Sequence, residues 1–262
     1  MVNLIPVKIK NIEENFFSVC RYWGNLNSSL KKTESIQAMN TGVAISDINW
    51  VWNEKPLTDD SANSIAEIKE YYKKLNLRFW WWVYPCGQSS ETERLLQDAE
   101  LRLFAKIPCM AADLNTSLRE MNSPDDITIS PVKNNTDLLI WETIAFHGFE
   151  MPPRVREQFR AFVSSFDLGA QSPQKLFLAY TNEIPVATSL LFTSKNSAGI
   201  YYVSTIPAYR NKGCGLRVTQ AAMQSAKASG FKDVILQATP MGAKVYMRAG
   251  FQEYCHSEIY KL

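Results

Sequence analysis

The strongest constraint on the fold is the segment 200–215, in which a strand-like stretch leads through a glycine loop into a helix. Residues 200–205 are mostly aromatic or β-branched and therefore favour an extended strand. Gly213 and Gly215 follow in a short polar loop, and helical periodicity then runs from about residue 215 to 229. A strand that passes through a short loop into a helix is typical of α/β folds, in which helices pack back onto a sheet.

The rest of the second half extends this order. The predicted strands span residues 127–132, 175–180, 185–193, 199–205, 234–238 and a stretch that begins at 251. The predicted helices span 137–146, 152–166 and 215–229, with a short one that ends at 248. Short connections between the strands at 175–205 predict an antiparallel meander, whereas the later alternation of strand and helix predicts parallel pairing. We therefore predict an α/β fold with a mixed, mostly antiparallel central sheet and flanking helices.

The first half repeats part of this order more faintly. Its predicted elements are a strand at 48–52, a helix at 61–75, a strand at 78–84, a helix at 91–103 and a strand that ends near 112. Matching Ile48 to Ile200 gives an offset of 152 residues, and matching Pro85 to Pro240 gives 155. Two such similar offsets predict a duplicated unit. A cluster of turn-forming residues at 122–126 lies between the halves, so we predict domains at 1–124 and 125–262.

Composition restricts the function. The 28 basic and 26 acidic side chains leave a net charge of only +2, which argues against nucleic acid or an anionic membrane as the main partner. Five widely spaced cysteines without a Cys-x-x-Cys pair, and two histidines, predict neither a metal site nor a disulfide framework. No apolar run approaches the ~20 residues of a membrane span. The first residues also lack a signal-peptide core, so we expect a cytoplasmic protein.

The glycine loop is a candidate phosphate site. Its two glycines allow several N–H groups to converge, and the helix N-terminus that follows adds partial positive charge. Arg210, Lys212 and Arg217 add formal charge at the same place. A dinucleotide fingerprint would need a third glycine where Val218 stands, and the Gly-x-x-x-x-Gly-Lys-Ser/Thr loop of nucleotide triphosphatases is absent. The structural alternative is a turn that only joins strand to helix.

Two motifs in the second half lie one after the other. The first reads Arg210-Asn211-Lys212-Gly213-Cys214-Gly215. The second spans residues 236–251, a strand and a short helix that ends in Tyr-x-x-x-Gly-Phe. Together they resemble the GNAT N-acetyltransferase superfamily, in which the first corresponds to the Arg/Gln-x-x-Gly-x-Gly/Ala pyrophosphate motif. Both lie in the order and at the separation of the family, across residues 125–262. The resemblance implies a GNAT fold, with acetyl-coenzyme A as donor and an amine as acceptor. It also implies that residues 1–124 are a degenerate first unit of a tandem protein.

The resemblance further implies roles for single residues. In the family, coenzyme A is held by the glycine loop, by the end of the strand before it and by the second motif, here Val203, Ser204, Thr205, Arg210, Asn211, Lys212, Gly213, Cys214, Gly215, Thr239 and Gly242. Tyr246 corresponds to the tyrosine that protonates the departing thiolate, with core packing as the structural alternative. Many relatives carry a glutamate as base on the strand before the loop, and here that strand carries no acid. Glu142, His147 and Glu150 remain as candidate bases, or as ordinary surface residues.

The first half is expected to differ in function. Its corresponding loop at 53–61 has no glycine and carries Asp59 and Asp60, which would repel a pyrophosphate, so we expect no coenzyme A there. The run Trp80-Trp81-Trp82 predicts a strand buried on both faces rather than a platform for a nucleobase or sugar. Two alternatives to an enzyme stay open, a non-catalytic acyl-coenzyme A sensor and an interaction module. The acceptor amine and the choice between monomer and homodimer are not determined by the sequence.

Overall fold

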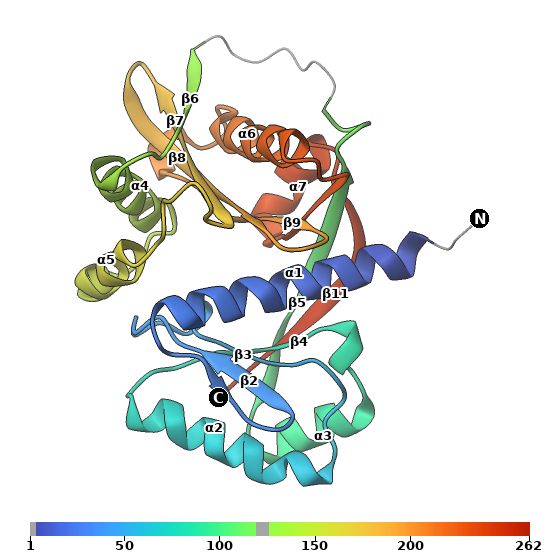
Figure 1. Cartoon of the computed structure of the whole chain (residues 1–262). Coiled ribbons are helices and arrows are strands. Elements are labelled where there is room, and N and C mark those ends of the chain that lie inside the picture. Colours follow the sequence, from blue (N-terminus) through green and yellow to red (C-terminus); the bar gives the residue numbers. More distant parts are fainter. Residues whose placement is uncertain (1–3, 119–125) are drawn as a thin grey trace. The chain divides into compact units, whose positions relative to one another are not determined.

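The computed structural model describes residues 4–118 and 126–262 and forms two compact units (Figure 1). Among the described residues, unit 1 comprises 4–15, 109–118 and 126–254, and unit 2 comprises Phe16–Pro108 and Cys255–Leu262. A single cut near residue 124 does not reproduce these units. The reason is strand pairing: residues 109–113 complete the sheet of unit 1, and the last residues of the chain complete the sheet of unit 2. The predicted boundary turn at residues 122–126 lies, except for its last residue, outside the described residues.

The sheet of unit 1 has the strand order β5-β10-β9-β8-β7-β6. These strands are β5 (Arg102–Asp113), β6 (Ile127–Pro131), β7 (Gln174–Thr181), β8 (Ile184–Thr193), β9 (Ala198–Thr205) and β10 (Asp233–Gln237). The predicted antiparallel meander is confirmed from β7 to β9, and β6 also pairs antiparallel with β7. β10 runs parallel to β9, as predicted, but its other neighbour is the antiparallel β5 from the first half of the chain. The mixed, mostly antiparallel sheet is therefore confirmed.

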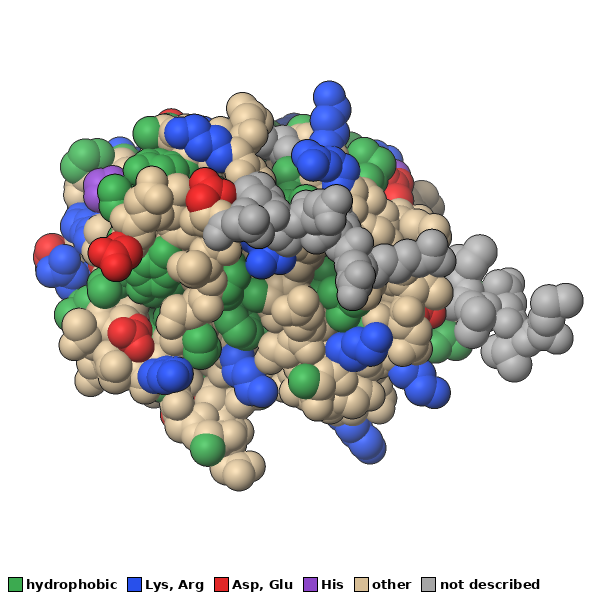
Figure 2. All heavy atoms as spheres, turned by 90° about the horizontal axis from the view of Figure 1, so that it is seen from above, with side chains coloured by type: hydrophobic (Ala, Val, Ile, Leu, Met, Phe, Trp, Pro, Cys, Tyr) green, Lys and Arg blue, Asp and Glu red, His purple; other side chains and the backbone are tan. Residues whose placement is uncertain are grey.

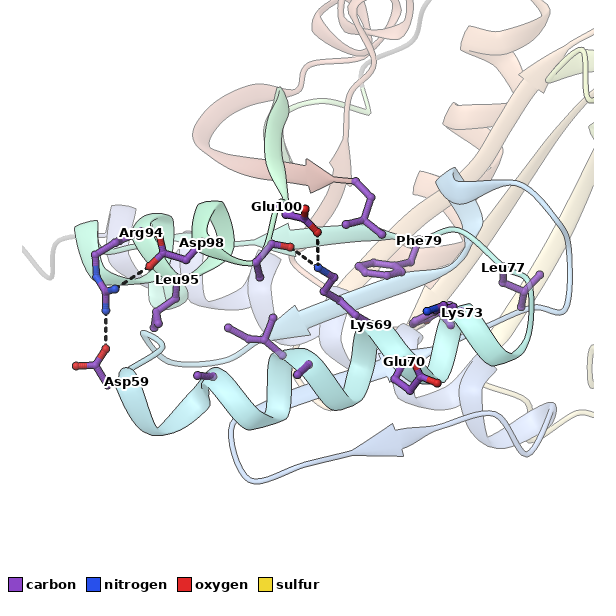
Figure 3. A pocket seen from close by; sticks show the side chains of 16 residues that line it. Asp59, Lys69, Glu70, Lys73, Leu77, Phe79, Arg94, Leu95, Asp98 and Glu100 are labelled. Carbon is purple, nitrogen blue, oxygen red and sulfur yellow. Dashed lines mark hydrogen bonds and ion pairs between the residues drawn. The ribbon is translucent and has the colours of Figure 1, made fainter.

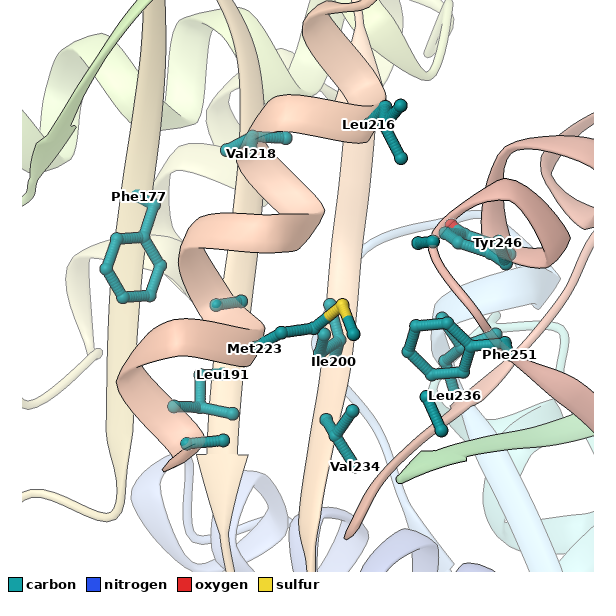
Figure 4. Close-up of a cluster of buried hydrophobic side chains, with 14 of the residues drawn as sticks. Phe177, Leu191, Ile200, Leu216, Val218, Met223, Val234, Leu236, Tyr246 and Phe251 are labelled. Atoms are coloured by element: carbon teal, nitrogen blue, oxygen red, sulfur yellow. The ribbon is translucent and has the colours of Figure 1, made fainter. Parts of the chain in front are cut away.

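Helices cover both faces of this sheet (Figure 1). They are α4 (Asn135–Gly148), α5 (Arg156–Ser164), α6 (Cys214–Ala228) and α7 (Pro240–Arg248). Side-chain caps explain two of the starts, because Asn134 accepts from the N–H of Asp137 and Thr239 from that of Gly242. Buried apolar side chains of α6 and α7 form one core with the strands, shown in Figure 4 with Leu191, Ile200, Met223, Leu236 and Phe251 among them.

The helix α1 (Leu4–Leu26) was not predicted from the sequence. In unit 1, the buried Asn15 side chain donates to the carbonyls of Phe192 and Ser197 and accepts from the Tyr201 hydroxyl at 2.8 Å. The Asn15 amide oxygen also occupies the space above Gly199, where an added Cβ would lie 2.0 Å from it. Asn15 therefore fixes the connection between β8 and β9.

Unit 2 has the strand order β1-β2-β3-β4-β11. Its elements are β1 (Lys31–Lys32), β2 (Ile36–Met39), β3 (Trp50–Asn53), β4 (Trp80–Val83), β11 (Gln252–Lys261), α2 (Ala62–Lys74) and α3 (Ser90–Asp98). Short 3-10 turns lie at Ser46–Ile48, Asp59–Ser61, Pro85–Gly87, Pro153–Val155 and Pro207–Tyr209 in the two units. The helix predicted at 91–103 ends earlier, at Asp98, because Glu100 adopts a left-handed φ of 66° before β5 begins.

The tryptophan run is a buried strand, as predicted. Trp81 is fully buried on the side of α2 and α3, whereas the ring of Trp82 lies on the other side, 4.9 Å from that of Phe16 in α1. Trp80 alone is half-buried. The order β3-α2-β4-α3-β5, with β3 parallel to β4, matches β9-α6-β10-α7-β11 in the second half. This correspondence supports the predicted duplication.

The surface carries mixed charge. On the face drawn in Figure 2, Lys and Arg side chains are spread over several separate places, with Asp and Glu side chains between some of them. Within the described part of the chain, no helix has both the length and the apolar character needed to cross a membrane.

Candidate functional site

A β-bulge in β9 lies at the centre of the candidate site. The register between β8 and β9 shifts between Thr188 and Leu190, so that one residue of β8 faces both Tyr202 and Val203 of β9. Tyr202 adopts a left-handed φ of 50°, which is rare for an aromatic residue. The buried Thr188 hydroxyl donates to the Tyr202 carbonyl at 2.8 Å and lies 2.8 Å from the Ser204 hydroxyl. These contacts hold the bulge in place.

Ser189, the residue of β8 opposite the bulge, forms hydrogen bonds to a helix on each face of the sheet. The Ser189 carbonyl accepts from the indole Nε1 of Trp141 in α4 at 3.2 Å. Its hydroxyl donates to the Val218 carbonyl of α6 at 2.9 Å. Because Ser189 and Trp141 are both fully buried, the indole provides the Ser189 carbonyl with a hydrogen-bond partner at the bulge.

β9 leaves β10 after its first two residues. The parallel pairing joins Ala198 to Val234 and Gly199 to Ile235, and no further pair connects the described residues of the two strands. Residues 200–205 therefore present one backbone edge to an extended ligand. The predicted pantetheine-binding residues all lie here. The side chain of Ser204 is already bonded to Thr188, so a ligand would meet only its backbone.

The glycine loop ends in a helix N-terminus with vacant donors. Gly213 adopts a left-handed φ of 88° directly before α6. The first helical amide with a carbonyl acceptor is that of Arg217, which donates to Gly213 at 3.0 Å. The amides of Cys214, Gly215 and Leu216 therefore have no intrahelical acceptor. The Nε of Arg217 is also buried and has no acceptor among the described residues. Such a set of donors suits an anion.

The side chains of the other loop residues lie in different environments. The Cys214 side chain is buried, with its Sγ 3.9 Å from the Thr181 hydroxyl, so only its backbone faces the loop. Asn211 has a left-handed φ of 64° and is exposed. Lys212 is exposed and lies over the Tyr209 ring at 4.8 Å.

Protein groups hold the guanidinium of Arg210. Its Nε donates to the Thr205 carbonyl at 3.2 Å, and its Nη2 donates to the Gly148 carbonyl at 2.9 Å and to the Glu150 carboxylate at 3.0 Å. Arg210 therefore connects the end of β9 to the end of α4. Gly148 makes this approach possible, because an added Cβ would lie 2.5 Å from the Ser204 hydroxyl.

Residues of the second motif fix the position of the Tyr246 ring. Its ring packs against Phe251 with 5.9 Å between centroids, and only 8% of the residue is exposed (Figure 4). Gly242 lies against the ring, where an added Cβ would come within 2.8 Å, and the Thr239 hydroxyl caps α7 by accepting from the Gly242 N–H at 3.2 Å. Burial raises the pKa of the Tyr246 hydroxyl well above its ordinary value of 10. The phenol therefore keeps its proton at neutral pH.

The three candidate bases lie on or next to α4 in different environments. Glu142 is 1% exposed, and its Oε2 forms an ion pair with Arg156 at 3.0 Å. Burial raises the pKa of the Glu142 carboxyl, against the opposing effect of the neighbouring arginines. Glu150 is exposed and paired with Arg210. His147 is exposed, and its ring contacts Phe146 edge to face at 5.6 Å.

The loop of unit 2 that corresponds to the glycine loop lies beside a groove with a different lining. Its loop ends in the 3-10 turn Asp59–Ser61, and Asp59 forms an ion pair with Arg94 of α3. A cavity of about 890 Å³ lies between α2 and α3, with apolar residues such as Leu95 on its floor and a Lys69–Glu100 ion pair on its rim (Figure 3). The absence of a coenzyme A site in this unit stays a prediction.

Sequence reasoning did not single out Thr188, Ser189, Trp141 and Gly148. None belongs to a local motif, since each acts through a partner far away in the chain. The positive φ of Tyr202 also has no signature, because tyrosine is not a residue that favours it.

The chain is similar to known proteins both in sequence and in fold. The sequence model of the acetyltransferase (GNAT) family matches residues 136–251. A GCN5-related N-acetyltransferase from Kribbella flavida is 15% identical, with a TM-score of 0.72 and 94% of each chain covered. A GCN5-related N-acetyltransferase from Sphaerobacter thermophilus is 16% identical, with a TM-score of 0.63, covering 87% of this chain and 76% of that one. No curated protein sequence matches the chain.

A tandem arrangement also has a structural counterpart. A tandem GNAT protein from the clavulanic acid biosynthesis pathway is 10% identical, with a TM-score of 0.57, and the match covers 87% of this chain and 78% of that one. At these identities the structural comparisons establish the fold alone.

Proposed function

Residues 136–251 form a domain of the acetyltransferase (GNAT) family, and from this premise we propose that the protein transfers the acetyl group of acetyl-coenzyme A directly to an amine. The observation that carries the proposal is the pairing of an open edge on β9 with a helix N-terminus whose first amides have no intrahelical acceptor. The edge of β9 would pair with an amide-rich chain, and the helix N-terminus would bind a pyrophosphate. Coenzyme A contains both of these groups.

The described residues fit this donor. The amides of residues 214–216 and the buried Nε of Arg217 would bind the pyrophosphate. The backbone of Val203 and Thr205 would pair with the pantetheine arm by β-augmentation. Arg210 contributes positive charge beside the loop while its donors stay bonded to protein groups. All of these residues lie within residues 125–262, the proposed catalytic domain.

The transfer is a single acyl substitution. The amine nitrogen attacks the thioester carbonyl carbon, a C–N bond forms and the C–S bond breaks. A backbone N–H at the β9 bulge would stabilise the developing oxyanion, a contribution typically of about 10²–10³ in rate. Tyr246 would give its proton to the departing thiolate, and the amine would lose its proton to a base.

Of the candidate bases, His147 is the best supported. Glu142 is buried beside Arg156, and Glu150 is paired with Arg210, so both carboxylates are already engaged by guanidinium groups. His147 is exposed at the end of α4, close in sequence to Gly148, which packs on the bulge residue Ser204. We therefore assign the base role to His147, acting directly or through water.

The decisive experiment compares two left-handed glycines. Gly213 precedes the open amides of α6, whereas Gly230 ends the same helix with open space around it. Both Gly213→Val and Gly230→Val introduce a β-branched residue at positive φ, so both should lose similar stability. Only Gly213→Val should abolish coenzyme A binding in calorimetry. Equal affinity in the two variants would refute the site.

A thiol-release assay with a panel of amines separates an enzyme from a sensor. We expect free coenzyme A to appear only when an acceptor amine is present. Binding of acetyl-coenzyme A without release under any amine would support the sensor instead.

A further inference from the structure

Aromatic side chains surround the bulge on the side of α4 and α5. The Tyr202 ring contacts three rings edge to face or tilted, at 5.5 Å for Trp141, 5.9 Å for Phe149 and 6.3 Å for Phe159. Trp141 and Phe159 are fully buried. Phe149 is 43% exposed and Tyr202 is partly exposed, so the cluster has a buried base and an open edge.

The backbone directs Tyr202 into this cluster. Its left-handed φ of 50° is unfavourable for a bulky side chain, and such conformations persist where the surroundings enforce them, often at functional positions. Here Thr188 bonds the Tyr202 carbonyl, and Val203, the next residue, lies on the edge proposed to hold the thioester. An acceptor that reaches this edge from α4 would therefore touch the Tyr202 and Phe149 rings.

The charges around the cluster do not favour a polycation. Glu142 lies between Arg156 at 3.0 Å and Arg160 at 3.9 Å. Glu150 is paired with Arg210 at 3.0 Å. Each acidic side chain of α4 and its C-terminal turn that faces a neighbouring element is thus matched by arginine, which leaves no surplus of negative charge to attract a polyamine.

We propose that the acceptor is a primary amine carried on an aromatic or branched apolar group, which packs against Phe149 and Tyr202. This inference rests on the proposed acetyl transfer and specifies its substrate class. Aromatic rings provide such a group with apolar area and preferred edge-to-face contacts. The amine would project from the group toward the bulge, where the thioester is proposed to lie.

The test is a comparison of acceptors and variants. Acetylation of 2-phenylethylamine, 3-methylbutylamine and spermidine would be followed by thiol release at saturating acetyl-coenzyme A. We expect both apolar amines to exceed spermidine in kcat/KM by at least about tenfold, the scale of discrimination by an apolar pocket. Phe149→Ala should lower kcat/KM for 2-phenylethylamine by about tenfold.

Two further variants serve as controls. Leu139→Ala truncates another exposed apolar residue of α4, 47% exposed, and should leave kcat/KM unchanged. Tyr202→Phe keeps the ring and should retain the preference, whereas Tyr202→Leu should reduce it. Faster transfer to spermidine, or an unchanged preference in Phe149→Ala, would overturn the inference while leaving acetyl transfer intact. Coenzyme A binding without transfer to any amine would instead overturn the proposed function.

Discussion

The carboxylate of Glu150 and the guanidinium of Arg210 form an ion pair with 3.0 Å between Oε2 and Nη2. The sequence assigned these residues to different tasks, one as a base and the other as a ligand of the cofactor. Their pairing joins the end of α4 to the end of β9, the same junction at which Gly148 packs on Ser204. Both residues therefore help to position the end of α4 relative to the bulge.

The first prediction separates the two members of this pair. Glu150→Gln should change the free energy of unfolding by less than about 1 kcal/mol, because the carboxylate is exposed to water. Arg210→Ala should cost about 1–3 kcal/mol, because it also removes the donors to the Thr205 and Gly148 carbonyls. Urea unfolding of both variants measures the difference. Equal losses would mean that the two carbonyl contacts contribute nothing.

A second prediction concerns Tyr246. Tyr246→Phe keeps the packing against Phe251 but removes the proton, so we expect kcat to fall by about 10²-fold or more. The affinity for coenzyme A should stay the same. Tyr254→Phe, in the same unit, provides the control and should leave kcat unchanged. If Tyr246→Phe turned over at the rate of the unmodified protein, Tyr246 would have only its packing role.

A third prediction concerns the hydroxyl that holds the bulge. Thr188→Val preserves shape but leaves the Tyr202 carbonyl and the Ser204 hydroxyl without their partner, at a cost of about 1–3 kcal/mol. Because we propose that the bulge aims the backbone at the thioester, kcat should fall as well. Thr193→Val removes a hydroxyl donor to Pro173, also in unit 1, and serves as the control. It should lose stability with no change in kcat; the same fall in kcat in both variants would contradict the role of the bulge.

A fourth prediction follows from the burial of Glu142. Its pKa is raised above the ordinary 4.5, so the folded state binds its proton more tightly than the unfolded state does. The contribution of Glu142 to the free energy of unfolding is fully present below pH 4.5, and it is lost as the pH rises through the pKa of the folded state. The variant Glu142→Gln lacks this titration.

Urea unfolding of both proteins from pH 4 to 7 gives the measurement. The unfolding free energy of the unmodified protein, minus that of Glu142→Gln, should decrease as the pH rises. A difference that increased with pH would show that Arg156 and Arg160 outweigh burial and lower the pKa of the carboxyl.

Local patterns predicted most of unit 1. The elements from β6 to α7 lie close to their predicted ranges, because turn formers, glycines and prolines mark many of their ends. Unit 2 was predicted less completely. The helix α1 and the strands β1 and β2 were missed, and α3 was predicted too long, because Glu100 breaks the helix without a glycine signal.

The compact units are a second case in which local patterns were insufficient. Turn-forming residues suggested one boundary, whereas β5 and β11 each contribute residues to both units. Strand partners are chosen by contacts between residues that are distant in the chain, and composition near a turn does not encode them.

The sequence by itself determined the glycine loop before α6 and the motif around Tyr246, because a left-handed glycine, a helix start and a capped short helix are local properties of the chain. Only the tertiary structure decided that β9 bulges at Tyr202 and that Arg210 is bonded to Glu150 rather than free. These features depend on the register of two strands and on the meeting of α4 with β9. Both are contacts between residues that are far apart in the chain, and such contacts leave no local sequence pattern.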